Sequence, residues 1–191
     1  ATELARQVAQ DVTLVAEVIR EVNSPWYRPT APVRTIEGAL MLLGQNGLRM
    51  LLARVAFRPV ISAQTGRLAR QAAPLLWRHS EKCALAASLA APAYGADAFE
   101  ACLAGLTRNV GLVVALRLID QVDAPGRLPQ SDSFAHALHE TARMLSARIA
   151  PQWELPPPVA AAILQSGPPG GPPLRPPPPS RGRAAPLRPL L

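Results

Sequence analysis

Residues 74–119 read PLLWRHSEKCALAASLAAPAYGADAFEACLAGLTRNVGLVVALRLI, and they contain two long apolar patterns with helical spacing. The spacing predicts one helix over 74–91, with Pro74 in its first turn, where a missing N–H costs nothing. It predicts a second helix over 96–119 that is interrupted near Gly111. We expect these two helices to form the central pair of a helical bundle.

The segment before this pair also has helical periodicity. Apolar residues recur at spacings of three and four over residues 11–22, and this helix is expected to end at residues 23–25, because Asn-Ser-Pro cannot continue it. Thr35 caps a further helix, Gly44 breaks it, and the apolar stripe then continues to Val55. No strand pattern occurs anywhere, so the predicted fold class is all-α.

The segment after the pair predicts two more helices and then a change of composition. The segment Ser131-Asp132-Ser133 can cap a helix that runs to about Ile149, and a last short helix covers 159–164. The sequence then becomes rich in Pro, Gly and Arg, which cannot bury enough apolar surface to offset chain entropy. The prediction is a helical domain over 1–166 and a disordered tail over 167–191.

Composition restricts the partners that the protein can have. With 191 residues, of which 49% are hydrophobic, the chain can bury one sizeable core. Its net charge of +7 includes four arginines after Gly167 with no acid beside them, so only +3 belongs to residues 1–166. Because no basic cluster interleaves with aromatic residues, nucleic acid is not favoured as a partner.

The cysteines and the apolar segments indicate the compartment. Cys83 and Cys102 lie in apolar helical sequence without a metal-ligand spacing, so they are interpreted as small core residues in a reducing compartment. No run of about eighteen uninterrupted apolar residues and no signal sequence is found, so a cytoplasmic protein without membrane contact is expected. Nineteen arginines against the single Lys82 are typical of a GC-rich bacterial genome.

The sequence resembles the HDOD family, a helical output domain of bacterial signalling proteins that is related to HD-type metal phosphohydrolases. The resemblance covers roughly residues 3–165. It rests on the segments DVTLVAEVIREVNSPWY (11–27), TIEGALMLLGQNGLRMLL (35–52), WRHS (77–80), AGL with a following VG (104–106 and 110–111), and WELPPPVAAAIL (153–164). It implies an HD-domain-like helical bundle.

The resemblance also implies that a metal site has been lost. HD phosphohydrolases hold divalent ions with imidazoles and carboxylates that activate water. His79 corresponds to the first of these ligands, but Arg108 and Asn109 stand where the His-Asp pair belongs. Arg108 would place a permanent cation where a metal would sit. We therefore predict no catalytic, metal-binding or cofactor-binding residues, and a protein that is not an enzyme.

Two interpretations of the altered site remain open. His79 can be a buried imidazole that hydrogen-bonds a neighbouring helix. Alternatively, His79, Arg108 and Asn109 form a small pocket for a phosphate or a nucleotide, since a guanidinium suits phosphate oxygens. Arg108 can equally turn to solvent or pair with Asp97 or Glu100.

Four further residues have side chains that bind metals in other proteins. Asp120 offers a carboxylate for a residual site with His79, although one His and one Asp hold a divalent ion weakly. His136 and His139 lie three residues apart, and Glu140 follows them. Without a third identifiable ligand, a solvated helical face is the favoured interpretation of this segment.

These observations predict a non-catalytic regulatory or protein-interaction module of bacterial signal transduction, whose partner is another signalling protein or domain. One alternative is a sensor that binds a nucleotide or second messenger in the emptied pocket. The other is a residual metal-dependent phosphohydrolase.

Overall fold

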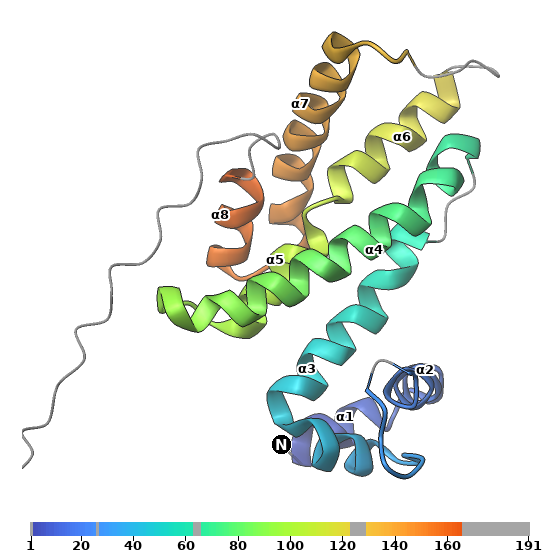
Figure 1. The fold of residues 1–191 in the computed structure, drawn as a ribbon, viewed down its shortest axis with the longest axis vertical. Coiled ribbons are helices and arrows are strands. Elements are labelled where there is room, and N and C mark those ends of the chain that lie inside the picture. The colour runs from blue at the N-terminus through green and yellow to red at the C-terminus, as the bar shows by residue number, and fades with distance from the viewer. Residues whose placement is uncertain (1, 26, 63–65, 123–128, 166–191) are drawn as a thin grey trace, which may run out of the picture.

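The computed structural model describes residues 2–25, 27–62, 66–122 and 129–165, and within these ranges the chain is helical without any strand (Figure 1). The expected all-α fold is confirmed. The helices are α1 (Thr2–Val8), α2 (Val12–Val22), α3 (Ile36–Ser62), α4 (Arg67–Ala90), α5 (Ala98–Thr107), α6 (Val110–Val122), α7 (Asp132–Ile149) and α8 (Pro157–Gln165). Short 3-10 turns, Ala91–Tyr94 and Ala150–Trp153, follow α4 and α7. The sequence analysis did not predict α1.

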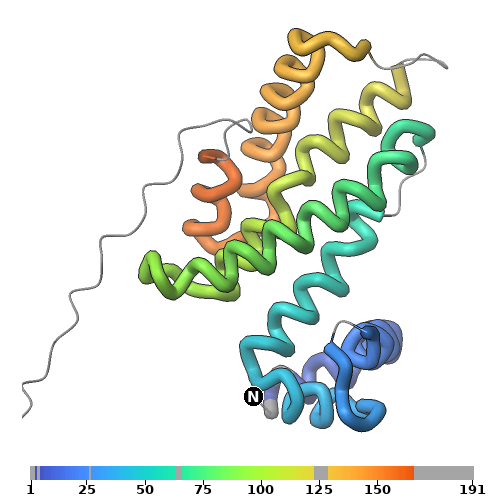
Figure 2. Tube along the Cα trace, in the orientation of Figure 1, coloured from blue at the N-terminus to red at the C-terminus, as the bar shows by residue number. Residues whose placement is uncertain are grey.

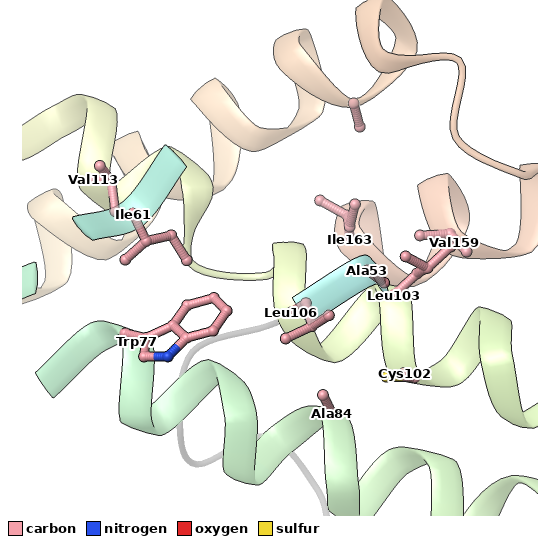
Figure 3. Close-up of a cluster of buried hydrophobic side chains, with 11 residues drawn as sticks. Ala53, Ile61, Trp77, Ala84, Cys102, Leu103, Leu106, Val113, Val159 and Ile163 are labelled. Atoms are coloured by element: carbon pink, nitrogen blue, oxygen red, sulfur yellow. The ribbon is translucent and has the colours of Figure 1, made fainter. Parts of the chain in front are cut away.

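The buried apolar side chains form two clusters that α3 connects. In Figures 1 and 2, α1 and α2 lie beside the N-terminal half of α3, α4 and α5 pack against its C-terminal half, and α7 and α8 lie beyond them, away from α3. The N-terminal cluster comprises Ala5, Val8, Val18, Val22, Ile36, Ala39, Leu48 and Leu51. The C-terminal cluster, shown in Figure 3, comprises Ala53, Ile61, Trp77, Ala84, Cys102, Leu103, Leu106, Val113, Ala150, Val159 and Ile163. Trp77 is therefore a core residue.

Helix α3 is kinked where the sequence predicted a break. Thr35 Oγ1 accepts a hydrogen bond from the N–H of Gly38 at 3.0 Å, which caps the start of the helix. Gly44 then takes a φ of 69° and a ψ of 177°, a backbone conformation that a residue with a Cβ rarely adopts. Residues on both sides of the kink, from Ile36 to Leu51, belong to the N-terminal cluster, and α3 enters the C-terminal cluster from Ala53 onward.

Helix α4 begins earlier than predicted. It starts at Arg67, so Pro74 lies inside the helix and not in its first turn. The side chain of Asp120, from α6, accepts hydrogen bonds from the N–H groups of Leu68 and Ala69, both at 2.9 Å. This carboxylate supplies the cap that the local sequence lacks, since Gly66 at the N-cap makes no side-chain hydrogen bond.

The second helix predicted for the central pair is divided in two. Helices α5 and α6 are separated at Arg108 and Asn109, slightly before the predicted interruption at Gly111. The stretch Ala98–Val122 is long and apolar enough to span a membrane, yet 61% of its most apolar window is buried inside the protein. Most of its apolar side chains therefore pack inside the bundle, although Leu118 and Val122 are exposed.

The remaining predicted helices are confirmed, and the structure shows their caps. Asp11 caps α2 by accepting from the N–H of Leu14, and Ser131 caps α7 by accepting from the N–H of Phe134. Asn23 fixes the loop after α2, because its amide both donates to the carbonyl of Val33 at 2.7 Å and accepts from the N–H of Val33 at 2.8 Å. The last helix starts at Pro157, close to the prediction.

Some expectations concern residues that lie outside the described ranges. These include the Pro-rich tail over 167–191, which was predicted to be disordered.

Candidate functional site

The altered HD position lies where the middle of α4 meets the junction of α5 and α6. Asn109, at this junction, is buried, and its Nδ2 donates to the buried hydroxyl of Ser80 at 3.0 Å. The same Nδ2 lies 3.1 Å from Nδ1 of His79. A neutral His79 that accepts this hydrogen bond carries its proton on Nε2. The structure therefore brings His79 and Asn109 together, as the sequence predicted.

His79 differs from one expectation, and Arg108 from another. The imidazole bonds a neighbouring element as expected, but it is exposed to solvent instead of buried. Arg108 is also exposed and forms no ion pair with Asp97 or Glu100, all three of which belong to the described part of the chain. Its Nη1 instead lies 3.6 Å from Sγ of Cys83, which is 3.7 Å from Nε2 of His79.

Two glycines on either side of the site allow the helices to approach closely. A Cβ added to Gly105 would lie 2.4 Å from the backbone of Ala84, and one added to Gly111 would lie 1.9 Å from the carbonyl oxygen of Ala142. The N–H of Gly111 also donates to Oγ of Ser146 at 3.1 Å. The two glycines hold α5 against α4 and α6 against α7, with the altered position between them.

The residues at this position do not fit a divalent metal ion. A site for hydrolysis needs at least three imidazole or carboxylate ligands. Among the residues that the structure describes, no group of three His, Cys, Asp or Glu side chains is close enough to hold a metal. His79 is accompanied by an amide and a guanidinium, and the guanidinium repels a cation.

The carboxylate of Asp120 caps the start of α4 and lies far from His79. Hydrogen bonds from the N–H groups of Ala69 and Leu68 lower the pKa of its carboxyl. His79 lies ten residues after Ala69 on α4, which is about 15 Å along the axis at the rise of an α-helix. Asp120 is therefore a cap of α4 and does not complete a site with His79.

The two histidines of α7 lie on its exposed surface. His136 and His139 are both solvent-exposed, and Glu140 forms an ion pair with Arg143. That hydrogen bond lowers the pKa of Glu140. The arrangement agrees with the interpretation of a solvated helical face.

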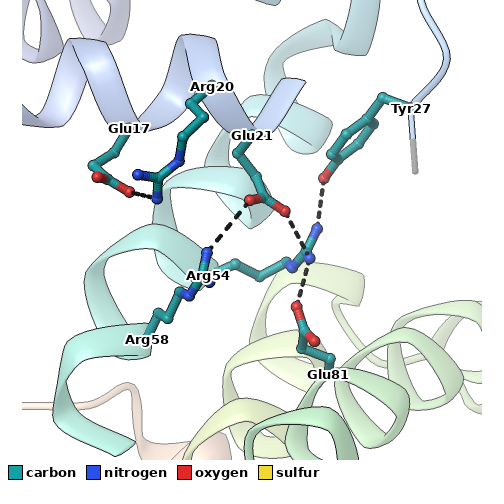
Figure 4. Close-up of polar contacts among 7 residues, drawn as sticks. All are labelled: Glu17, Arg20, Glu21, Tyr27, Arg54, Arg58 and Glu81. Atoms are coloured by element: carbon teal, nitrogen blue, oxygen red, sulfur yellow. Dashed lines mark hydrogen bonds and ion pairs between the residues drawn. The ribbon is translucent and has the colours of Figure 1, made fainter. Parts of the chain in front are cut away.

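A polar cluster around Arg54 was not predicted from the sequence. Figure 4 shows that the Arg54 guanidinium, on α3, joins three elements. Its Nη1 donates to the hydroxyl of Tyr27 at 3.0 Å, and its Nη2 donates to Glu21 of α2 at 3.0 Å and also to Glu81 of α4. Arg58 adds a longer contact of 3.8 Å to Glu21. The cluster ties the N-terminal helices to the central pair.

Burial determines the electrostatics of this cluster. Burial raises the pKa of Tyr27, and the neighbouring Arg54 only partly offsets this effect. Burial alone would lower the pKa of Arg54, but its bonds to Glu81, Tyr27 and Glu21 outweigh that cost, so its pKa is raised. A small cleft beside the cluster is lined by Glu17, Glu21, Arg54, Val55, Arg58, Trp77 and Glu81. The sequence signal was an arginine one turn after buried Leu51, on the apolar face of α3.

Within the described residues, the all-α bundle places one histidine, His79, beside Asn109 and Arg108, with no group of side chains that could hold a metal ion. The family model of the HDOD domain matches residues 1–169, which is most of the chain. The protein therefore belongs to the HDOD family.

A solved structure gives independent support for the fold. The chain is similar to the crystal structure of an HDOD domain protein with unknown function from Geobacter sulfurreducens, with a TM-score of 0.63 and 26% sequence identity. The match covers 85% of this chain and 56% of the other, so the chain spans little more than half the length of that relative. A comparison with curated proteins gave no match.

Proposed function

We propose that this domain is a non-catalytic regulatory module that binds another signalling protein or domain in the bacterial cytoplasm. The observation that carries the proposal is the role of Asn109. Its buried amide is used to bond Ser80 and His79 across the helix interface, where a metal enzyme would use a carboxylate to hold an ion. The position of Asn109 thus contributes to packing between α4 and the α5–α6 junction, while the neighbouring Arg108 lies at the surface beside Cys83.

The geometry gives less support to a nucleotide sensor. An anion in a pocket of His79, Arg108 and Asn109 would need donors that point into a shared space. The Asn109 amide is instead committed to Ser80 and His79, and the Arg108 guanidinium lies against Cys83.

Metal content and hydrolysis test the proposal together. The protein, purified without chelator, is analysed by elemental mass spectrometry and assayed with bis-p-nitrophenyl phosphate in the presence of Mn²⁺, Mg²⁺ or Zn²⁺. We expect no stoichiometric metal and no turnover. The double variant Arg108→His/Asn109→Asp is the matched control, because it restores the missing pair beside His79. Bound metal together with turnover in the unmodified protein would overturn the non-catalytic function.

A further inference from the structure

We propose that the exposed face of α4 is the docking surface for an acidic, amphipathic helix of the partner. This inference rests on the proposed function and identifies the chemistry of the partner. The surface, called the α4 stripe below, consists of Gln71, Leu75, Arg78, Lys82, Leu85 and Leu89.

The spacing of the α4 stripe is that of a helix-packing seam. Its members follow one another at intervals of four, three, four, three and four residues, which places them on one side of the helix. All six are exposed, and the three leucines are 62%, 43% and 73% exposed at positions 75, 85 and 89. In the interior of a protein, this pattern would be covered by a second helix.

The charge within the stripe determines which helix fits. Arg78 and Lys82 lie between the leucines, and no ion pair involves either of them within the described ranges. The acid nearest to them along α4 is Glu81, whose carboxylate is bonded to Arg54 of α3. A partner helix with an apolar seam flanked by Asp or Glu would cover the leucines and pair with both cations.

The same charges disfavour a second copy of this chain. The centre of the stripe lies near residue 80, so two copies packed antiparallel would bring Arg78 of one against Lys82 of the other. Two parallel copies would place each cation opposite its own equivalent. Like charges facing each other across a helix seam destabilise the pair.

The arrangement also differs from that of a membrane-binding helix. Such helices segregate their cations to the polar face and present a continuous apolar face to the lipid. Here the two cations interrupt the apolar face at its middle. The stripe extends over about 27 Å, which matches a partner helix of about five turns.

The test compares two fluorescein-labelled peptides by anisotropy, using the full chain. Both are three-heptad helices with leucine at the a and d positions, and the remaining positions carry mainly glutamate in one and lysine in the other. We expect saturable binding of the acidic peptide and none of the basic one. The double variant Arg78→Glu/Lys82→Glu should lower the affinity for the acidic peptide at least about tenfold, and Leu89→Ser should lower it several-fold.

The matched control is Met144→Ser/Arg148→Glu on α7, which alters an exposed apolar residue and a cation outside the stripe. This variant should bind the acidic peptide as the unmodified protein does. Binding that is equally weakened in the control, or no binding of the acidic peptide, would overturn the inference.

Two further measurements test whether a membrane or a second copy of the chain covers the α4 stripe instead. Stripe-dependent binding to phosphatidylserine vesicles without peptide binding would assign the face to membranes. Self-association in sedimentation equilibrium that is lost in Leu89→Ser would assign it to a second copy. Either result overturns the inference, and neither affects the metal and hydrolysis measurements on which the proposed function depends.

Discussion

Asn109 and Ser80 are hydrogen-bonded to each other in the interior, with the amide Nδ2 3.0 Å from the hydroxyl oxygen. The two residues come from elements that are 29 positions apart in the sequence. The contact fixes the α5–α6 junction against α4 at the point where an HD enzyme would build its metal site. Its loss should be measurable as a loss of stability.

Asn109→Ala should lower the free energy of unfolding by about 1–3 kcal/mol, because the substitution removes a buried donor and leaves the Ser80 hydroxyl without this partner. Urea denaturation followed by circular dichroism measures the change. Arg108→Ala is the control, since this exposed neighbour should change stability by less than about 0.5 kcal/mol. Equal effects of the two substitutions would contradict the structural role given to Asn109.

Gly111→Ala should be among the most disruptive small substitutions in the chain. The added methyl group would lie 1.9 Å from the carbonyl oxygen of Ala142, so α6 and α7 must separate. We expect a loss of at least about 3 kcal/mol, or a failure to fold. Gly38→Ala is the matched control, because its Cβ would meet neighbours at an ordinary 3.4 Å. A Gly111 variant as stable as this control would contradict the close approach.

The Asp120 cap should make stability depend on pH. Its pKa is lower in the folded protein than in the unfolded chain, so its contribution is fully present above the unfolded value of about 3.9 and is lost as the pH falls through the folded value. Urea midpoints measured at neutral and at strongly acidic pH should therefore differ more in the unmodified protein than in Asp120→Asn. If the urea midpoint of Asp120→Asn depends on pH as strongly as that of the unmodified protein, the Asp120 cap is not the cause of the acid sensitivity.

Local signals in the sequence predicted most of the helices. Thr35 caps α3 and Ser131, from the predicted capping segment, caps α7, and Gly44 breaks α3 as its residue type indicates. The start of α4 was placed wrongly because its cap comes from Asp120, which is distant in the sequence.

The same limit applies to the altered site. The resemblance named His79 and Asn109, which the structure places together, but the exposure of His79 depends on how α4 is rotated in the bundle, which periodicity places only approximately. The Arg54 cluster was missed because its partners are 27 and 33 residues away. A charged residue within an apolar stripe indicates a buried pair without identifying the partner.

Arg54 yields the last prediction, because its guanidinium is the only group shown to contact Glu21, Tyr27 and Glu81 together within the described residues. Arg54→Met keeps most of the aliphatic volume but leaves two mostly buried carboxylates without their shared cation. We expect a loss of about 3 kcal/mol in urea denaturation. Arg54→Lys should recover little of it, since one ammonium cannot reproduce the planar fork that reaches three partners.

The triple variant Arg54→Met/Glu21→Gln/Glu81→Gln distinguishes electrostatics from packing. If unpaired carboxylates cause the loss, neutralising both should recover much of the stability, because burying a charge without a partner costs more than burying an amide. If the triple variant is as unstable as Arg54→Met, the guanidinium acts through packing between α2, α3 and α4. Hydrogen exchange tests the link itself under either cause, since loss of the cluster should first increase exchange in α2, which Arg54 links to the central pair.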